Sequence, residues 1–254
     1  MAMKLAVAGK GGVGKTSLTA WLGDYLARLG REVWLVDADT AYSLGPALGL
    51  SKELTPAPLC ELSDLILERT SYGVINLNPQ VGDLPERLSV PVRDMRLLVM
   101  GTVVGAGAGC GCAANALLKA LLAHLFLENY QWVLVDLEAG VEHLGRGTAA
   151  SADGLVVVSD LSLRGLRTAA SIASLAKELG LVRQALVLNR AYGEFELPEV
   201  EGLPPLAGVL PELESLRRRQ LRDTSVLDLP QQPEIDRVCA GIIQFLAGAG
   251  QTSA

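Results

Sequence analysis

The sequence predicts an α/β protein built on a doubly wound, mainly parallel sheet with helices on both faces. Short apolar runs recur along the chain, and stretches with apolar residues at three- and four-residue spacing lie between several of them. Strands that alternate with helices are typical of a parallel sheet, in which each strand is buried on both faces and reads as a near-continuous apolar run. A glycine-rich turn joins the first run directly to the first helical stretch, as in the strand-loop-helix units of such sheets.

Each expected element follows from this pattern. The loops and helix ends are marked by proline and glycine: 53–59 and 196–206 are expected to be loops, and Gly30 and Gly180 fall where helices should be capped. No internal repeat, low-complexity tract or linker divides the chain, so we expect one domain over 1–254. The expected strands are 4–9, 33–39, 96–101, 132–138, 154–160 and 185–190, and the expected helices are 16–30, 114–129 and 163–180.

The bulk composition excludes several classes of protein. No apolar run approaches the about 18 residues that a membrane-spanning helix needs, and the N-terminus lacks the features of a signal peptide. Four cysteines in 254 residues fit a reducing compartment, and a net charge of −6 opposes a large nucleic-acid footprint. We therefore expect a cytoplasmic protein whose partners are neither nucleic acid nor membrane.

A phosphate-binding loop follows the first expected strand. Residues 9–16, GKGGVGKT, satisfy the pattern G-x-x-x-x-G-K-[ST] immediately before a helix. Backbone N–H groups of such a loop face phosphate oxygens, the lysine holds the β- and γ-phosphates, and the hydroxyl binds Mg²⁺. A flexible glycine turn is the alternative. The expected nucleotide-binding residues here are Gly9, Lys10, Gly11, Gly12, Val13, Gly14, Lys15 and Thr16, with Ser17 reaching the α-phosphate.

Lys10 is a second lysine inside this loop. With it, the string resembles the deviant Walker A motif of the family that contains the MinD and ParA ATPases, the nitrogenase iron protein and the arsenite-pump ATPase. The resemblance implies an ATP-hydrolysing homodimer in which Lys10 reaches the partner's nucleotide and, with Lys15, neutralises transition-state charge. The alternative for Lys10 is a solvated loop charge.

Three aspartates stand at the ends of expected strands, on the side of the sheet where the phosphate loop is expected. Asp37 and Asp39 end the second strand, and Asp136 opens the string DLEAG after another apolar run. Ligands of open α/β sheets bind at this edge. Resemblance to the same family implies that Asp39 orients or deprotonates the attacking water, that Asp37 and Asp136 serve Mg²⁺ beside Thr16, and that the Gly140 N–H reaches the γ-phosphate. Strand-end capping is the alternative for the aspartates.

Asn189 ends the strand LVLNR and matches the asparagine that reads adenine in this family. Its amide can pair with both the donor and the acceptor edge of a base. The segment 208–212, GVLPE, resembles the later loop that flanks the base. An asparagine in an ordinary strand-end turn is the alternative.

Cys110 and Cys112 lie in a loop of small residues, expected to be exposed, that leads into the helix at 114. Two thiols cannot close a tetrahedral site, whereas a two-fold axis would gather four thiolates suited to Zn²⁺, Ni²⁺ or Cu⁺. Small buried residues or a redox pair are the alternatives. Cys60 and Cys239 have no such spacing and are expected to be structural.

The phosphate loop, the Cys-x-Cys loop and the run DLEAGVEHLGRGTA at 136–149 together resemble the CooC family of nickel-insertion ATPases. The resemblance implies a nickel-binding maturation factor that serves carbon monoxide dehydrogenase or a related nickel enzyme, with Ni²⁺ or Zn²⁺ on Cys110 and Cys112. His143, within this run, is either a switch residue or a structural histidine. An iron–sulfur carrier and a positioning ATPase that binds DNA or membrane remain alternatives.

Overall fold

A computed structural model describes residues 2–70, 76, 78–102, 110–127, 132–141 and 152–248 of the chain. Among them, eight strands form one sheet in the order β3-β4-β2-β5-β1-β6-β7-β8. Neighbouring strands are parallel except β3 and β4, which form an antiparallel hairpin at one edge. The strands are β1 (Met3–Gly9), β2 (Val33–Ala38), β3 (Val90–Val92), β4 (Met95–Val99), β5 (Trp132–Leu137), β6 (Gly154–Ser159), β7 (Gln184–Ala191) and β8 (Leu206–Pro211).

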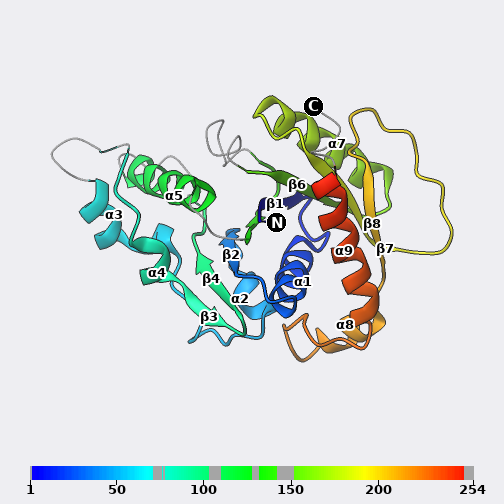
Figure 1. Cartoon of the computed structure of the whole chain (residues 1–254), viewed down its shortest axis with the longest axis horizontal. Helices are drawn as coiled ribbons and strands as arrows, with labels where there is room; N and C mark the ends of the chain where they lie inside the picture. Colours follow the sequence, from blue (N-terminus) through cyan, green and yellow to red (C-terminus); the bar gives the residue numbers. More distant parts are fainter. Residues whose placement is uncertain are drawn as a thin grey trace.

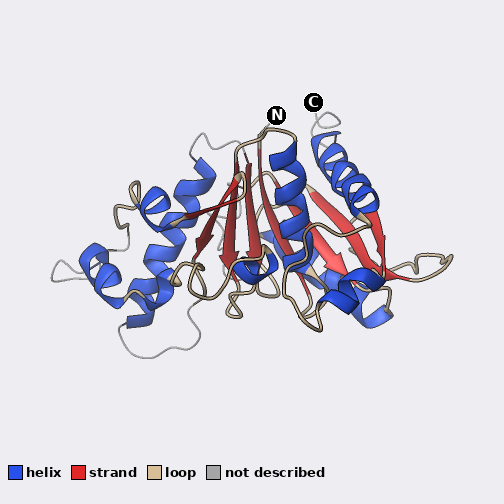
Figure 2. Cartoon of the chain, turned by 90° about the horizontal axis from the view of Figure 1, so that it is seen from below, coloured by secondary structure: helices blue, strands red, loops and turns tan. Residues whose placement is uncertain are grey.

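Helices cover both faces of this sheet (Figures 1 and 2). One face packs against α1 and α9, and the other packs against α4, α5 and α7, with α3 packed on α5. The helical segments are α1 (Lys15–Arg28), α2 (Leu44–Ala47), the 3₁₀ segment η1 (Leu59–Glu61), α3 (Ser63–Thr70), α4 (Leu84–Leu88), α5 (Cys110–Leu127), α7 (Leu163–Glu178), α8 (Glu214–Arg219) and α9 (Gln232–Gly248).

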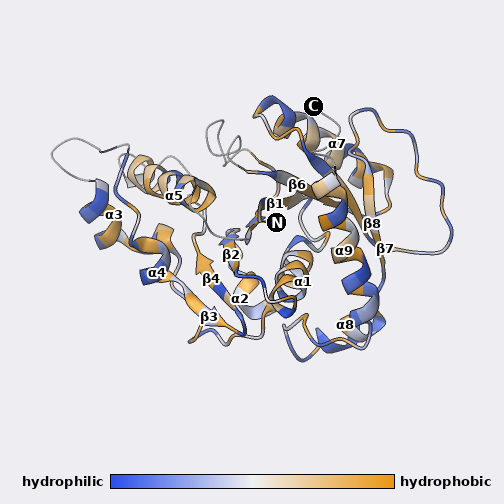
Figure 3. Cartoon of the chain, viewed as in Figure 1, coloured by the Kyte–Doolittle hydropathy of each residue, from blue (hydrophilic) through white to orange (hydrophobic). Residues whose placement is uncertain are grey.

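The alternation of β1 shows how the sequence builds two cores. Leu5 and Val7 belong to the core beneath α1 and α9, whereas Ala6 and Ala8 belong to the core beneath α5 and α7. Successive strand residues point to opposite faces, so a strand buried on both faces has no polar side. In Figure 3, β4 is mostly hydrophobic, whereas the exposed α8 is mostly hydrophilic.

The fold class expected from the sequence is confirmed, with α1, α5 and α7 found near the expected helices. Gly30 and Gly180 cap α1 and α7 with φ of 72° and 96°. Two boundaries differ. Helix α5 begins at Cys110 rather than at 114, and most of 208–212, expected to be a loop, belongs to strand β8. Pairing with β7 and packing on α9 give β8 tertiary support that its own sequence does not reveal.

No helix in the described parts of the chain combines the length and apolar character needed to cross a membrane.

Candidate functional site

Three central strands end beside one another at the candidate site. Strand β5 lies between β2 and β1, and the parallel register pairs Asp136 with Asp37 on one side and with Val7 on the other. Residues 9–16 therefore leave β1 next to two aspartates. The Gly9 N–H donates to the carbonyl of Ala139 at 2.9 Å, which joins this loop to the segment after β5.

The loop turns into α1 at Gly14. Its φ of 99° lies in the left-handed region, and a Cβ added there would lie 2.3 Å from the Asn189 Nδ2. Only glycine has both the conformational freedom and the small size that this position requires. Gly14 caps α1 without a side-chain hydrogen bond, which leaves the first N–H groups of the helix facing the loop.

Lys15 is buried, with 5 % of its surface exposed. Within the part of the chain that the structure describes, no hydrogen bond or ion pair holds its ammonium group. A buried unpaired cation is costly, so this geometry favours an anionic ligand such as a phosphate.

Thr16 and Asp136 form a candidate magnesium site. The Thr16 hydroxyl donates to Asp136 Oδ2 at 2.6 Å and lies 3.2 Å from the Ser43 hydroxyl. The other carboxylate oxygen, Asp136 Oδ1, is buried and has no hydrogen-bond partner among the described residues. Mg²⁺ prefers hard oxygen ligands, so an uncommitted carboxylate oxygen beside a hydroxyl fits that ion.

Asp37 is fully buried and, unlike Asp136, uses both of its carboxylate oxygens in hydrogen bonds. Its Oδ2 accepts a hydrogen bond from the Leu44 N–H at 2.9 Å, and its Oδ1 accepts one from the Asp39 N–H at 3.1 Å. These bonds curl the segment after β2 around the carboxylate. Burial raises the pKa of Asp37 to about 6, against the opposing effect of the two backbone donors. Asp37 therefore organises the loop while lying in register with Asp136.

Burial also raises the pKa of Asp136, to about 7. The hydrogen bond from Thr16 opposes this rise, the neighbouring Asp37 adds to it, and the charge of Lys15 opposes it. Two buried carboxylates side by side disfavour full ionisation, and a bound cation would relieve the repulsion.

Three further predicted residues surround this centre. Lys10 and Asp39 are half-buried, and one Asp39 carboxylate oxygen accepts the Ala41 N–H at 2.9 Å. Gly140 is buried directly after Ala139. The structure thus brings the loop lysines, the three aspartates and Gly140 to one edge of the sheet.

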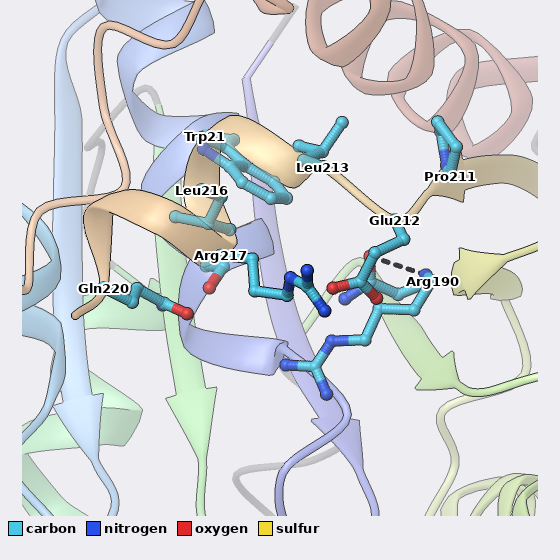
Figure 4. A pocket seen from close by; sticks show the side chains of 10 residues that line it. Trp21, Arg190, Pro211, Glu212, Leu213, Leu216, Arg217 and Gln220 are labelled. Carbon is cyan, nitrogen blue, oxygen red and sulfur yellow. Dashed lines mark hydrogen bonds between the residues drawn. The ribbon is translucent and has the colours of Figure 1, made fainter.

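Asn189 lies beside the phosphate loop and lines a pocket of about 250 Å³. Figure 4 shows this pocket from close by. Its Nδ2 donates to the Val13 carbonyl at 2.8 Å, and its Oδ1 accepts the Arg190 N–H at 3.0 Å. Ser17, Pro211 and Glu212 line the same pocket, so the ends of β7 and β8 meet α1 beside Asn189.

The sequence did not point to several residues of this site. Asp37 curls the turn after β2, and this brings the Ser43 hydroxyl close to that of Thr16. Trp21 of α1, Arg190 of β7 and Arg217 of α8 line the pocket beside Asn189. Arg217 points toward Glu212 and Arg190 in Figure 4, while its side chain is 69 % exposed and pairs with Glu214 of its own helix. The only local signal for Ser43 was its closeness in sequence to Asp39.

Cys110 and Cys112 begin α5 rather than lying in a loop before it. Helix α5 is 18 residues long, and the free thiol of Cys112 is exposed. The Cys110 side chain, the glycine-rich residues 103–109 and His143 lie outside the described residues. Cys239 is buried in the core, which raises its pKa, whereas Cys60 lies 3.4 Å from the Tyr42 hydroxyl and is half-buried.

Comparison with known proteins places this geometry in a family. Residues 4–226 match the family model of the CobQ/CobB/MinD/ParA nucleotide-binding domain. The carbon monoxide dehydrogenase accessory protein CooC of Rhodospirillum rubrum is 40 % identical over 74 % of this chain and 74 % of its own length. An uncharacterized ATP-binding protein of Methanocaldococcus jannaschii is 34 % identical over 96 % of this chain and 98 % of its own.

Solved structures agree with this assignment at the level of fold. The MinD cell division protein of Aquifex aeolicus superimposes with a TM-score of 0.67 at 22 % identity, covering 97 % of each chain. MinD of Pyrococcus horikoshii in complex with Mg-ADP gives a TM-score of 0.66 at 21 % identity, over 99 % of this chain and 100 % of that one. The chain therefore belongs to the CobQ/CobB/MinD/ParA family of nucleotide-binding domains, and within it is a CooC-type ATPase.

Proposed function

We propose that this ATPase is a cytoplasmic nickel-binding maturation factor. It closes as a homodimer around ATP and metal, and it assists nickel insertion into carbon monoxide dehydrogenase or a related nickel enzyme. The observation that carries the proposal is the exposed Cys112 thiol at the start of α5 in a chain 40 % identical to a carbon monoxide dehydrogenase accessory protein.

The nucleotide site supplies the energy of this cycle. Lys15 binds the β- and γ-phosphates, Thr16 and Asp136 hold Mg²⁺, and Asp37 supports them from the neighbouring strand. When bound, Mg²⁺ neutralises charge on the phosphates. Asp39 orients the attacking water, and Lys10 stabilises the transition state in the partner subunit. Hydrolysis removes the γ-phosphate and thereby favours the open dimer.

Nickel is the cargo, and the Cys-x-Cys pair supplies only two thiols from each chain. Among the residues that the structure describes, no group of three or more His, Cys, Asp or Glu side chains could hold a metal. A two-fold axis that brings together Cys110 and Cys112 of two chains would supply four soft thiolate ligands. The dimer would therefore hold the metal more tightly than either monomer.

An anaerobic Ni²⁺ titration with light scattering tests this function, with and without nucleotide. Wild type should bind one Ni²⁺ per dimer, and the Cys110→Ala, Cys112→Ala double variant should lose that binding. Cys239→Ala is the matched control, because this buried thiol lies in the core away from α5. Equal binding by wild type and the double variant, or none by either, would remove the nickel assignment. Visible absorption of the anaerobically purified protein would instead indicate an iron–sulfur cluster.

A further inference from the structure

One cluster near the candidate site serves neither phosphate nor magnesium. The Tyr42 hydroxyl donates to Glu61 Oε1 at 3.0 Å and lies 3.4 Å from Cys60 Sγ. Tyr42 belongs to the turn that follows β2, whereas Cys60 and Glu61 belong to η1. Burial first, and then the hydrogen bonds to Cys60 and Glu61, raise the pKa of the Tyr42 hydroxyl, which keeps it protonated as a donor. The cluster therefore fastens η1 to the turn after β2.

The backbone of Tyr42 is held in an unusual conformation. Its φ of 48° lies in the left-handed region, which a non-glycine side chain enters only at a cost. The turn that imposes this conformation begins at the nucleotide site. Asp37 accepts the N–H groups of Asp39 and Leu44, and the Tyr42 N–H donates to the Asp39 carbonyl at 3.4 Å. The conformation of Tyr42 therefore depends on the positions of Asp37 and Asp39, the two aspartates expected to lie near magnesium and the attacking water.

The same cluster packs closely against Gly101, in the segment that precedes α5 in the sequence. A Cβ at Gly101 would lie 2.6 Å from Cys60 Sγ and 2.9 Å from Tyr42 Cε1. Hydrogen bonds hold the flanking backbone: Met100 and Gly101 donate to the Asp37 carbonyl at 2.8 and 3.1 Å, and the Cys60 N–H donates to the Met100 carbonyl at 3.1 Å. The Thr102 hydroxyl donates to the Ala38 carbonyl at 2.6 Å.

A second route reaches α5 through packing. Leu59 of η1 is fully buried in the same core cluster as Ala113 and Ala114, which lie in the first turns of α5. Helix α5 contacts η1, so a displacement of η1 is expected to shift α5, whose first residues include Cys112. Packed elements transmit such shifts because cores have discrete arrangements and little free volume.

We propose that Tyr42 is a positioning residue that couples the nucleotide site to the start of α5, so that nucleotide binding changes the accessibility of the Cys112 thiol. The inference rests on the proposed function in one respect, that Cys112 is a thiol that meets the metal. It goes further by naming the link: the turn after β2 moves with nucleotide, and Tyr42 carries that movement to η1 and to Met100–Thr102. Cys60 accordingly belongs to this link and is more than the structural thiol expected from its spacing.

The test measures alkylation of Cys112 by iodoacetamide in the metal-free, full-length protein, resolved by mass spectrometry, with and without Mg²⁺ and a non-hydrolysable ATP analogue. In wild type, nucleotide should change the rate about fivefold or more, the lower end of usual coupling energies. Tyr42→Phe keeps the ring but removes the hydroxyl, and it should reduce the change to less than about twofold while nucleotide affinity stays within about threefold. Glu61→Leu removes the exposed partner and should act alike.

Tyr25→Phe is the matched control, because Tyr25 packs on α1 against Arg28. It should keep the wild-type response. The proposal is overturned if Tyr42→Phe and Glu61→Leu both retain the full nucleotide response, or if wild type shows none. Because nickel is absent, a normal thiol response combined with a failed nickel titration would contradict the proposed function and leave the role of Tyr42 standing.

Discussion

Asp136 combines burial, an uncommitted oxygen and a neighbouring carboxylate, and these features make its protonation state the main electrostatic variable of the site. Its pKa is raised from 3.8 to about 7. The unfolded chain releases this proton at lower pH than the folded protein does. Between these two values the folded state binds more protons, so the free energy of unfolding falls as pH rises from about 4 to about 7.

Asp136→Asn should therefore stabilise the metal-free protein at pH 8, by about 1–3 kcal/mol, with the difference vanishing near pH 4. Asparagine keeps an oxygen that can accept the Thr16 hydrogen bond. Urea unfolding across this pH range measures the effect, and Asp94→Asn, at an exposed position, is the control. Stability that is the same in Asp136→Asn and wild type at pH 8 would mean that the buried charge is not the destabilising element.

The two lysines of the phosphate loop should separate binding from catalysis. Lys15 is buried and is proposed to bind the phosphates, so Lys15→Ala should weaken ATP binding about a hundredfold or more. Lys10 is only half-buried and is proposed to act on the partner's nucleotide, so Lys10→Ala should lower hydrolysis with affinity changed by less than about fivefold. Calorimetric ATP titration and single-turnover hydrolysis give the two quantities. Equal losses of affinity in both variants would contradict this division.

At the scale of elements, the contact between the phosphate loop and β7 is the most constrained junction. Gly14→Ala forces a side chain into φ of 99° and places its Cβ 2.3 Å from the Asn189 amide. We expect a loss of about 2–4 kcal/mol in the free energy of unfolding, together with weaker ATP binding. Gly11→Ala is the matched control, because a Cβ there meets nothing within 4 Å and its φ is not in the left-handed region. Thermal and urea unfolding of both variants check the difference, and equal stabilities would show that Gly14 is not constrained as described.

How well the elements could be predicted depended on whether their cause was local. The phosphate loop could be predicted from the spacing of its glycines. Gly30 and Gly180 could be predicted as helix ends because glycine commonly ends a helix in the left-handed conformation, which both adopt. The start of α5 was not recognisable. Cys110, Gly111 and Cys112 have weak helix propensity, and burial of Ala113 and Ala114 in the core supports a helix there.

The same distinction holds for the candidate site. Lys15, Asp37 and Asp136 could be predicted because each stands at the end of an apolar strand or in a motif with fixed spacing. Ser43 and Tyr42 could not be predicted, because they approach the site only where hydrogen bonds to Asp37 curl the turn after β2. Arg190 and Arg217 line the pocket beside Asn189 because strands and helices distant in sequence converge there.

At the scale of the whole molecule, the sheet separates two hydrophobic cores, one on each face. The central strands present the phosphate loop and the aspartates, while α5, carrying Cys112, lies on the face opposite α1 and α9. The turn after β2, η1 and Met100–Thr102 form the described connection between them. On the proposed coupling, nucleotide bound at the carboxyl ends of the central strands changes the environment of Cys112 at the start of α5.

The central claim is that ATP and Ni²⁺ favour the same closed dimer. The most direct measurement is the Ni²⁺ dissociation constant under anaerobic conditions, with and without a non-hydrolysable ATP analogue, together with the reciprocal effect of Ni²⁺ on the affinity for that analogue. We predict that each ligand tightens binding of the other by the same factor, about fivefold or more, because linkage is reciprocal. Independent binding of the two ligands, with neither affinity changed, would contradict the account.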